Sequence, residues 1–428
     1  METLEFPKNF FWGASTSAHQ VEGQNKNNDW WRAEQLGLVP HQSGQAANHY
    51  ELFAKDFALA KQLDHNAHRF SIEWSRLEPE PGAFDQAATI HYRKMLIALR
   101  EMGIEPIVTL HHFTNPQWFA NLGGWQKPEA VKFFLRYVAY CLEHFGDYVN
   151  WWLTFNEPEN FATMAYGQGV WPPFKKNWWA VLRVCLNLAK AHRRAYKKIH
   201  AKQPKAKVGM AHAMIAYAPA NSDNFLNLAL TRIVKFFRND LFIKLLWKHF
   251  DFIGLNYYFY ARITGRLTPS TISPANALRS DLGWAIAPQG LTQVLRELHR
   301  FRKPIIITEN GLADRQDTLR KNFIINHLLA IYAAIAEGIN VRGYLHWSLL
   351  DSFEWQEGFS GRFGLIEVDL ASQARTIRPS AWILSEIIKA NGVPTAMLSI
   401  LNQNKKQPWP EAVKRAFQKI NRVNPLKS

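Results

Sequence analysis

The 428-residue chain has only two cysteines, Cys141 and Cys185, and each lies in an apolar pattern of helical period. Two such cysteines cannot cross-link a secreted scaffold of this size, so we expect a protein of a reducing compartment, the cytoplasm. No apolar run approaches the ~20 residues that cross a bilayer, and no signal-peptide pattern opens the chain. We therefore expect a soluble, unprocessed protein without a membrane span.

Several common site motifs are also missing. The sequence has no HExxH, EF-hand, GxGxxG or Walker pattern. Ser15, Thr16 and Ser17 have no His and Asp partners in a recognisable arrangement, which argues against serine hydrolysis. We expect no metal and no cofactor.

Acidic residues are scarce relative to basic ones: 35 Asp and Glu face 51 Lys and Arg, a net charge of +16. The excess lies mainly in residues 175–207, which contain no acid, and in residues 393–428, where Glu411 is the only acid. The remainder is close to neutral. A nucleic acid or an anionic surface is therefore a candidate partner for those two segments only.

Short apolar runs alternate with longer segments of helical period, which predicts parallel strands joined by helices. We expect strands at 10–15, 66–72, 104–112, 150–156, 206–213, 251–258, 304–309 and 341–347. Helices are expected at 48–63, 87–102, 128–146, 178–200, 289–301, 317–337 and 379–390. Eight near-continuously apolar strands favour a closed (β/α)₈ TIM barrel in a single domain, residues 1–392. Residues 393–428 would form a basic C-terminal extension.

Reactive groups of such barrels lie at the carboxyl ends of the strands, and these positions are unusually polar here. Repeated polar groups at apolar strand ends would be costly if they were buried without partners, so we expect them to converge on one polar pocket. The candidates are Gln20, Glu22, Arg69, His111, His112, Asn156, Glu157, Asn256, Tyr258, Glu309, Trp347, Glu354 and Trp355.

Two of these side chains, Glu157 and Glu309, would face each other across the barrel mouth, beside Asn156 and Asn310. A facing carboxyl pair can hydrolyse glycosides, one group protonating the leaving oxygen while the other acts at the anomeric carbon. A separation of about 5–5.5 Å gives retention of configuration, and about 6.5–9.5 Å gives inversion. The sequence leaves both outcomes open.

The motifs around these residues resemble those of glycoside hydrolase family 1, the β-glucosidase family. TFNEP at 154–158 and ITENG at 307–311 are similar to its acid/base and nucleophile motifs. Further similar segments run in the same order from residue 5 to about 392: FFWGASTSAHQVEG at 10–23, HRFSIEWSRLEP at 68–79, LHHFTNPQW at 110–118, GGWQKPE at 123–129, DFIGLNYY at 251–258, GYLHWSLLDSFEW at 343–355 and RFG at 362–364.

This resemblance implies a role for each matching residue. Glu157 would be the general acid/base and Glu309 the nucleophile of a retaining mechanism. Asn156 would hydrogen-bond the sugar 2-hydroxyl, while Arg69 and Tyr258 would favour the ionised form of Glu309 and Glu157 would need a raised pKa. The resemblance implies sugar contacts from Gln20, His112, Asn156, Glu354 and Trp355, with Trp347 as the platform beneath the ring.

The expected activity is hydrolysis of terminal β-D-glucosyl residues from small β-glycosides or short oligosaccharides, with tolerance for β-galactosides or β-fucosides. Glu354 would repel a phosphate on the sugar's sixth position, so the sugar should be unphosphorylated. Phe113 departs from the tryptophan of many family members. It would keep an aromatic wall without an indole N–H.

Other readings remain open. A non-catalytic sugar- or anionic-surface-binding barrel is the alternative function, and salt-dependent nucleic-acid binding is a weaker one.

We expect helix 178–200 to turn its basic face to solvent and the following residues inward: Trp178, Val181, Leu182, Cys185, Ala189, His192, Tyr196 and Ile199. We expect His111 and the tryptophan pairs at 30–31, 151–152 and 178–179 to pack in the core. His212 has no assigned role. Residues 408–423 form a candidate amphipathic basic helix.

Overall fold

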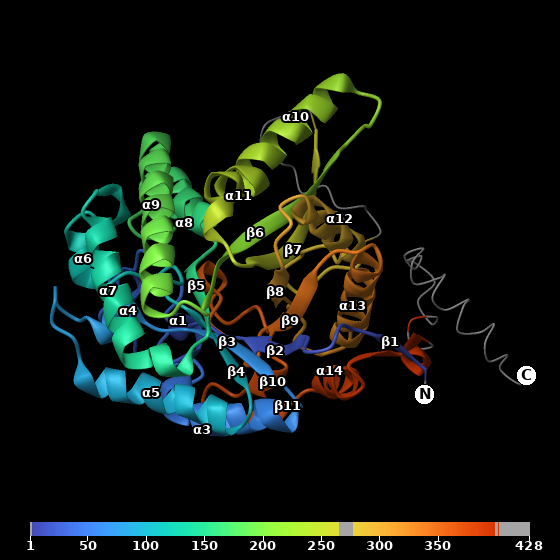
Figure 1. The fold of residues 1–428 in the computed structure, drawn as a ribbon, viewed down its shortest axis with the longest axis horizontal. Coiled ribbons are helices and arrows are strands. Elements are labelled where there is room, and N and C mark those ends of the chain that lie inside the picture. Colours follow the sequence, from blue (N-terminus) through green and yellow to red (C-terminus); the bar gives the residue numbers. More distant parts are fainter. Residues whose placement is uncertain (1, 265–276, 399–400, 402–428) are drawn as a thin grey trace, which may run out of the picture.

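The computed structural model describes residues 2–264, 277–398 and 401. Its centre is a closed barrel of eight parallel strands that follow one another in chain order, as the sequence predicts (Figure 1). The strands are β2 (Phe11–Ser15), β3 (Ala67–Ser71), β4 (Glu105–Thr109), β5 (Trp151–Asn156), β6 (Lys207–Pro219), β7 (Ile253–Ile263), β8 (Ile305–Asn310) and β9 (Val341–Trp347).

Helices cover the outside of this barrel and connect consecutive strands (Figure 1). The long ones are α3 (His49–Gln62), α5 (Gln86–Glu101), α7 (Ala130–Phe145), α9 (Trp178–Lys202), α12 (Pro288–His299), α13 (Arg320–Ala336) and α14 (Pro379–Lys389). Each lies within three residues of its predicted range. Polar side chains start several of them: Asp85 caps α5 and Asn177 caps α9 by accepting backbone N–H bonds.

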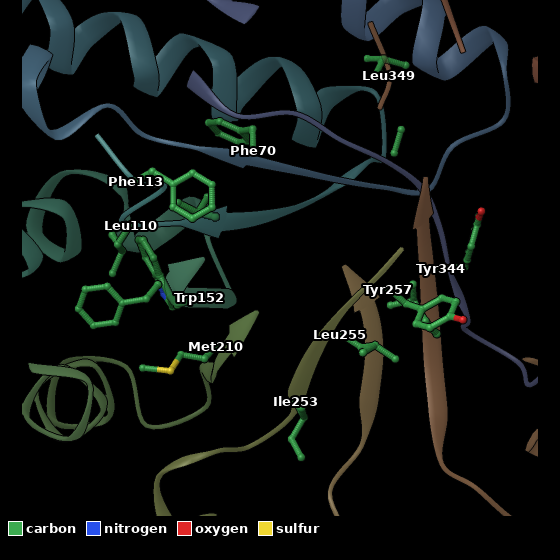
Figure 2. Close-up of a cluster of buried hydrophobic side chains, with 14 of the residues drawn as sticks. Phe70, Leu110, Phe113, Trp152, Met210, Ile253, Leu255, Tyr257, Tyr344 and Leu349 are labelled. Atoms are coloured by element: carbon green, nitrogen blue, oxygen red, sulfur yellow. The ribbon is translucent and has the colours of Figure 1, made fainter. Parts of the chain in front are cut away.

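The core has two layers. Inside the barrel, side chains from successive strands fill the interior, including Ile107, Leu153, Phe252 and Ile306. A larger cluster lies between the strands and the surrounding helices, and Figure 2 shows part of it, with Trp152, Met210, Ile253 and Leu255 among the labelled residues. The barrel is therefore a packed support for its loops.

Two short antiparallel pairs lie outside the barrel. β1 (Thr3–Glu5) pairs with β12 (Gly392–Pro394), and β10 (Ile366–Val368) pairs with β11 (Arg375–Ile377). Beyond β12, Met397, Leu398 and Leu401 are buried. The chain thus stays on the barrel for a few residues past the predicted boundary at 392. The predicted helix at 408–423 lies outside the described residues.

The sequence does not predict one protruding substructure. β6 and β7 continue beyond the barrel as a paired ribbon, from Ala216 opposite Tyr260 to Pro219 opposite Ile263. Helix α10 (Phe225–Lys235) packs on it and leads through the turn η4 (Phe236–Asp240) into α11 (Leu241–Leu246). In Figure 1, α10 projects away from the barrel, beyond the ring of helices.

Candidate active site

A cavity of about 310 Å³ opens at the carboxyl ends of the strands. Of the thirteen candidates, ten line it, Arg69 lies beneath it in an ion pair with Glu309, and Glu22 and His111 lie outside it, Glu22 in an ion pair with Arg76. The ten lining residues are Gln20, His112, Asn156, Glu157, Asn256, Tyr258, Glu309, Trp347, Glu354 and Trp355. The predicted convergence on one pocket is therefore observed.

Glu309, at the end of β8, is only 4% exposed and is held by charged and polar donors. Arg69 Nη1 forms an ion pair with Glu309 Oε1, and the Tyr258 hydroxyl donates to Oε2 at 2.9 Å. Burial raises the pKa of Glu309 above its ordinary value, while Arg69 and the hydrogen bond from Tyr258 act in the opposite direction. A cation in direct contact favours the carboxylate form of this residue.

Glu157, immediately after β5, is 7% exposed and has only amide donors among its hydrogen-bond partners. Asn256 Nδ2 donates to Oε1 at 2.8 Å, and Asn160 Nδ2 donates to Oε2 at 3.0 Å. Burial, reinforced by the charge of Glu309, raises the pKa of Glu157 to about 7. A proton can therefore remain on this carboxyl group near neutral pH.

The backbone at Glu157 is in the left-handed region, with φ of 43°, and its N–H donates to the carbonyl of Ala211 at 2.7 Å. Helix α8 (Pro158–Ala162) begins at the next residue. A non-glycine residue in this conformation costs free energy and is concentrated at functional sites, where the surrounding structure enforces it. The turn fixes where the carboxyl group of Glu157 lies.

Asn156 and Asn256 connect the two carboxyl groups through one buried network. Asn156 Oδ1 accepts from Arg69 Nη2 at 2.7 Å and from Asn256 Nδ2 at 3.0 Å. The Asn256 amide also lowers the pKa of Glu309 by hydrogen bonding. Arg69 is fixed in turn by its Nε, which donates to Thr109 Oγ1 at 3.0 Å. Asn256 thus lies between both glutamates, which confirms its prediction as a residue of the pocket.

The other end of the pocket is built from aromatic rings and hydrogen-bonding side chains. The His112 ring stacks with Trp347 at 6.1 Å and with Trp355 at 6.3 Å between ring centroids. Gln20 Nε2 donates to the carbonyl of Phe353 at 2.8 Å. Burial, with a smaller contribution from Arg69, holds the pKa of His112 well below its usual range, so its imidazole is neutral.

Glu354 accepts two hydrogen bonds on the same oxygen, Oε1, from Ser352 Oγ at 2.6 Å and from Trp347 Nε1 at 3.2 Å. Burial raises the pKa of Glu354 to about 8. We expected this group to carry a fixed negative charge. Because its raised pKa weakens that charge near neutral pH, charge repulsion by Glu354 alone is a weak reason to exclude a phosphate.

The predicted contrast between the two catalytic candidates is present in their neighbours. As expected, Arg69 and Tyr258 favour the ionised form of Glu309 and the pKa of Glu157 is raised, although burial acts to raise the pKa of both groups. What separates them is the set of neighbours, since Arg69 and Tyr258 contact Glu309 and only amides bind Glu157. Sequence reasoning identified the partners but underestimated desolvation.

The packing expectations are met at His111, Trp30 and Trp152, which are buried, but the prediction that Trp178 and Trp179 pack in the core is wrong, since they are 65% and 76% exposed. His111 is buried against Trp125 and lies outside the pocket, with its Nε2 3.0 Å from Asn115 Oδ1. Phe113 lines the pocket and packs against Trp171 at 4.7 Å, which keeps the aromatic wall. His212 lies 3.1 Å from Glu159 Oε1 through its Nδ1. Nothing in the fold assigns a chemical role to His212.

The remaining pocket wall comes from residues that sequence reasoning missed. They lie on loops, on short helical segments and on β6 and β7, mostly at positions that no strand end or helical period marks. These residues are Glu159, Asn160, Met164, Trp171, Ala213, Met214, Ile215, Arg238, Asn239, Phe259, Leu282, Trp284, Gln356, Glu357 and Phe363. Some of them pack directly on predicted sugar contacts, as Trp171 does on Trp355 at 5.9 Å between ring centroids.

Within the described ranges, we find no cluster of three His, Cys, Asp or Glu side chains that could hold a metal ion. The same residues include no helix that is both long and apolar enough to cross a bilayer.

Comparison with known proteins identifies the family. The sequence model of glycosyl hydrolase family 1 matches residues 2–246 and 233–393. A β-galactosidase from Pyrococcus woesei is 31% identical over 91% of this chain and 98% of its own, and β-glucosidase A from Acetivibrio thermocellus is 30% identical over 92% and 100%. The solved β-glycosidase from Pyrococcus horikoshii has a TM-score of 0.89 and 37% identity, covering 93% of this chain and 98% of that one.

A parallel barrel with two buried carboxyl groups at its mouth fits the chemistry of glycoside hydrolases. The chain belongs to glycosyl hydrolase family 1. It is therefore a glycoside hydrolase, which argues against the alternative of a non-catalytic binding barrel.

Proposed function

We propose that the protein is a retaining β-glycosidase in which Glu309 is the nucleophile and Glu157 the general acid/base. The observation that carries this assignment is the asymmetry of the two carboxyl groups. Arg69 and Tyr258 hold Glu309 in a form suited to attack, whereas Glu157 has no cationic partner and a pKa of about 7. A proton donor near neutral pH is what departure of the leaving group requires.

In the first step, a carboxylate oxygen of Glu309 attacks the anomeric carbon, while Glu157 transfers its proton to the glycosidic oxygen and the bond to the leaving group breaks. In the second step, the Glu157 carboxylate removes a proton from water, and the water oxygen attacks the anomeric carbon and releases Glu309. Asn156, fixed by Arg69 and Asn256, would bind the 2-hydroxyl more strongly in the transition state.

The sugar that we propose is glucose, with galactose and fucose as further substrates. Gln20, His112 and Glu354 offer donors and acceptors to its hydroxyl groups, and Trp347 offers a stacking surface. A protonated Glu354 could donate as well as accept at neutral pH. Relatives named both β-galactosidase and β-glucosidase support a breadth of this kind.

We also propose that the sugar is unphosphorylated. Among the described residues, the cavity wall contains one Arg or Lys, Arg238 of η4, and this arginine donates a hydrogen bond to Thr163. A phosphate bound beside Glu354 would lack the arginine or lysine partners that such groups need. Measurable hydrolysis of a 6-phospho-β-glucoside at the rate of the free β-glucoside would contradict this proposal.

Proton NMR of the first-formed product tests the mechanism. Hydrolysis of an aryl β-glucoside should release the β-anomer first, and the α-anomer should then grow by slow mutarotation. Initial release of the α-anomer would show inversion and overturn the assignment of Glu309 as nucleophile. A panel of aryl β-glucoside, β-galactoside and β-fucoside then ranks the sugars.

A further inference from the structure

Many large apolar side chains of the described chain are exposed on one stretch, from α9 to the end of α11. We define the apolar face by six of them: Trp178, Trp179, Leu182, Phe225, Phe237 and Leu245. Trp179 is 76% exposed and Phe225 is 81% exposed. Helices α9, α10 and α11 lie on one side of the barrel (Figure 1), and large exposed apolar side chains gathered on one side of a soluble protein mark an interaction site.

On helix α10, large apolar side chains face solvent and polar side chains face the protein, the reverse of an ordinary surface helix. Its buried side includes Asn227 and Thr231 beside Val234, whereas Phe225 and Ile233 are exposed. A helix that only covers the protein core shows the opposite arrangement. The outer side of α10 is therefore built to contact something other than water.

Helix α9 adds two adjacent tryptophans to the same face. The sequence prediction placed Trp178 and Leu182 inward, but they are 65% and 50% exposed, and small or shorter residues such as Ala180 and Val184 pack against the barrel instead. Tryptophan is enriched where protein meets the interface of a lipid bilayer, because its ring is apolar and its N–H is polar.

The segment that carries the apolar face has charge of one dominant sign. Between residues 175 and 248 the chain contains sixteen Lys and Arg but only two acidic residues, Asp223 and Asp240. Arg183, Arg232 and Lys244 are exposed on the helices that carry the apolar face. Asp240 forms ion pairs with Arg300 and Lys244, which leaves little negative charge in this region.

We propose that the apolar face docks on the surface of an anionic lipid membrane. Apolar side chains would enter the headgroup region while the surrounding cations bind lipid phosphates, as in interfacial amphipathic helices. A second copy of this chain fits less well, because a symmetric contact would bring two strongly positive faces together. This inference does not depend on the proposed hydrolytic mechanism.

The position of η4 connects the apolar face to the cavity. Arg238 and Asn239 line the cavity wall, and the preceding residue, Phe237, is exposed on the apolar face. Docking would therefore hold the cavity mouth beside the lipid surface, where β-glycosides with an apolar leaving group accumulate.

Sedimentation of the full chain with lipid vesicles tests the proposal. Phosphatidylcholine vesicles containing phosphatidylglycerol should bind the protein, and pure phosphatidylcholine vesicles should bind it much more weakly. The double variant Trp179→Ser/Phe225→Ser should lose at least tenfold in vesicle affinity. Arg183→Glu/Arg232→Glu should lose more than tenfold, since each basic side chain near an anionic surface contributes about fivefold.

Matched variants on the opposite side of the molecule provide the controls. Ile90→Ser/Trp382→Ser removes exposed apolar residues from α5 and α14, and Lys61→Glu/Lys94→Glu reverses exposed charges on α3 and α5 (Figure 1). Both controls should bind vesicles like the original protein. Circular dichroism and hydrolysis of a soluble aryl glycoside check that every variant is folded.

Three results would overturn the proposal. One is the absence of vesicle binding, and another is binding that all four variants retain, which would locate the attraction elsewhere in the chain. The third is a concentration-dependent dimer that Trp179→Ser/Phe225→Ser abolishes without any vesicle binding, since a second copy would then cover the apolar face.

Discussion

Glu157 and Glu309 have similar burial but different neighbours. The ion pair with Arg69 stabilises negative charge on Glu309, and no cation contacts Glu157. Desolvation acts on both groups, so the assignment of roles depends on which carboxyl group has a compensating charge. Two measurements at the residue scale examine this difference.

The first measurement is the pH dependence of kcat/KM. Because the pKa of Glu157 is raised to about 7, the group keeps its proton up to that pH and loses it above. We expect kcat/KM for a β-glucoside with a poor leaving group to fall about tenfold per pH unit above pH 7. A dinitrophenyl glucoside, whose leaving group needs little protonation, should show a much weaker decline. Equal profiles for both substrates would contradict the role of Glu157.

The second measurement is the stability of Glu157→Gln. The folded-state pKa of Glu157 lies above its ordinary value of 4.5, so its contribution to stability is largest below that value and falls as the pH rises to about 7. Above this range the variant should be more stable than the original by about 3 kcal/mol. Urea unfolding on either side of the window checks this, with the exposed Glu51→Gln as control. An equal gain at both pH values would show that desolvation of Glu157 is not its origin.

At the element scale, close contact between strand ends fixes the distance between the nucleophile and the sugar platform. A Cβ on Gly311, two residues after Glu309, would lie 1.7 Å from the backbone oxygen of Trp347. The ends of β8 and β9 can approach this closely only because residue 311 has no side chain.

We therefore expect Gly311→Ala to separate these strand ends. The variant should lose about 1–3 kcal/mol of stability or more, and kcat should fall even at temperatures where it is folded. Gly338→Ala is the control, since its Cβ meets no heavy atom within 4 Å and only its φ of +87° is unfavourable. Thermal unfolding and initial rates distinguish the two. Normal kcat in folded Gly311→Ala would contradict the role of this contact.

The helices and strands also show how much of the fold could be predicted from the sequence. Strong apolar runs and helical periods located the eight barrel strands and their helices, because burial on both faces imposes those patterns. The inward face of α9 was wrong at Trp178 and Leu182, which outweigh the smaller Ala180 and Val184 in any apolar count, and correct further along the helix, where His192 and Ile199 are buried. The β6–β7 ribbon and α10 were missed because the exposed apolar side of α10 obscures its amphipathic pattern.

The active site likewise contains residues that could be predicted from the sequence and residues that could not. Residues at strand ends, such as Glu309 and Asn156, follow from the barrel topology together with the family resemblance. Trp171, Arg238 and Phe259 complete the pocket from a loop, from η4 and from β7, and their positions depend on tertiary packing that no local period reveals. The leaving-group side is consequently the part that the sequence predicts least well.

At the scale of the whole molecule, the active-site cavity and the excess of basic side chains lie in different parts of the protein. The cavity holds Arg69 in an ion pair beneath it and Arg238 in its wall, while the basic excess lies on α9, α10 and α11. The net charge of +16 therefore carries little information about the reaction. The charge instead bears on the surface with which the enzyme associates, and the vesicle experiment tests that association.

The measurement that tests the central claim most directly is chemical rescue of Glu309→Gly. Without its nucleophile the variant should not hydrolyse an aryl β-glucoside, and added azide, entering the vacated space below the sugar, should yield the α-glycosyl azide. Formation of the β-glycosyl azide, or undiminished hydrolysis by Glu309→Gly, would contradict the assignment of Glu309 as the nucleophile.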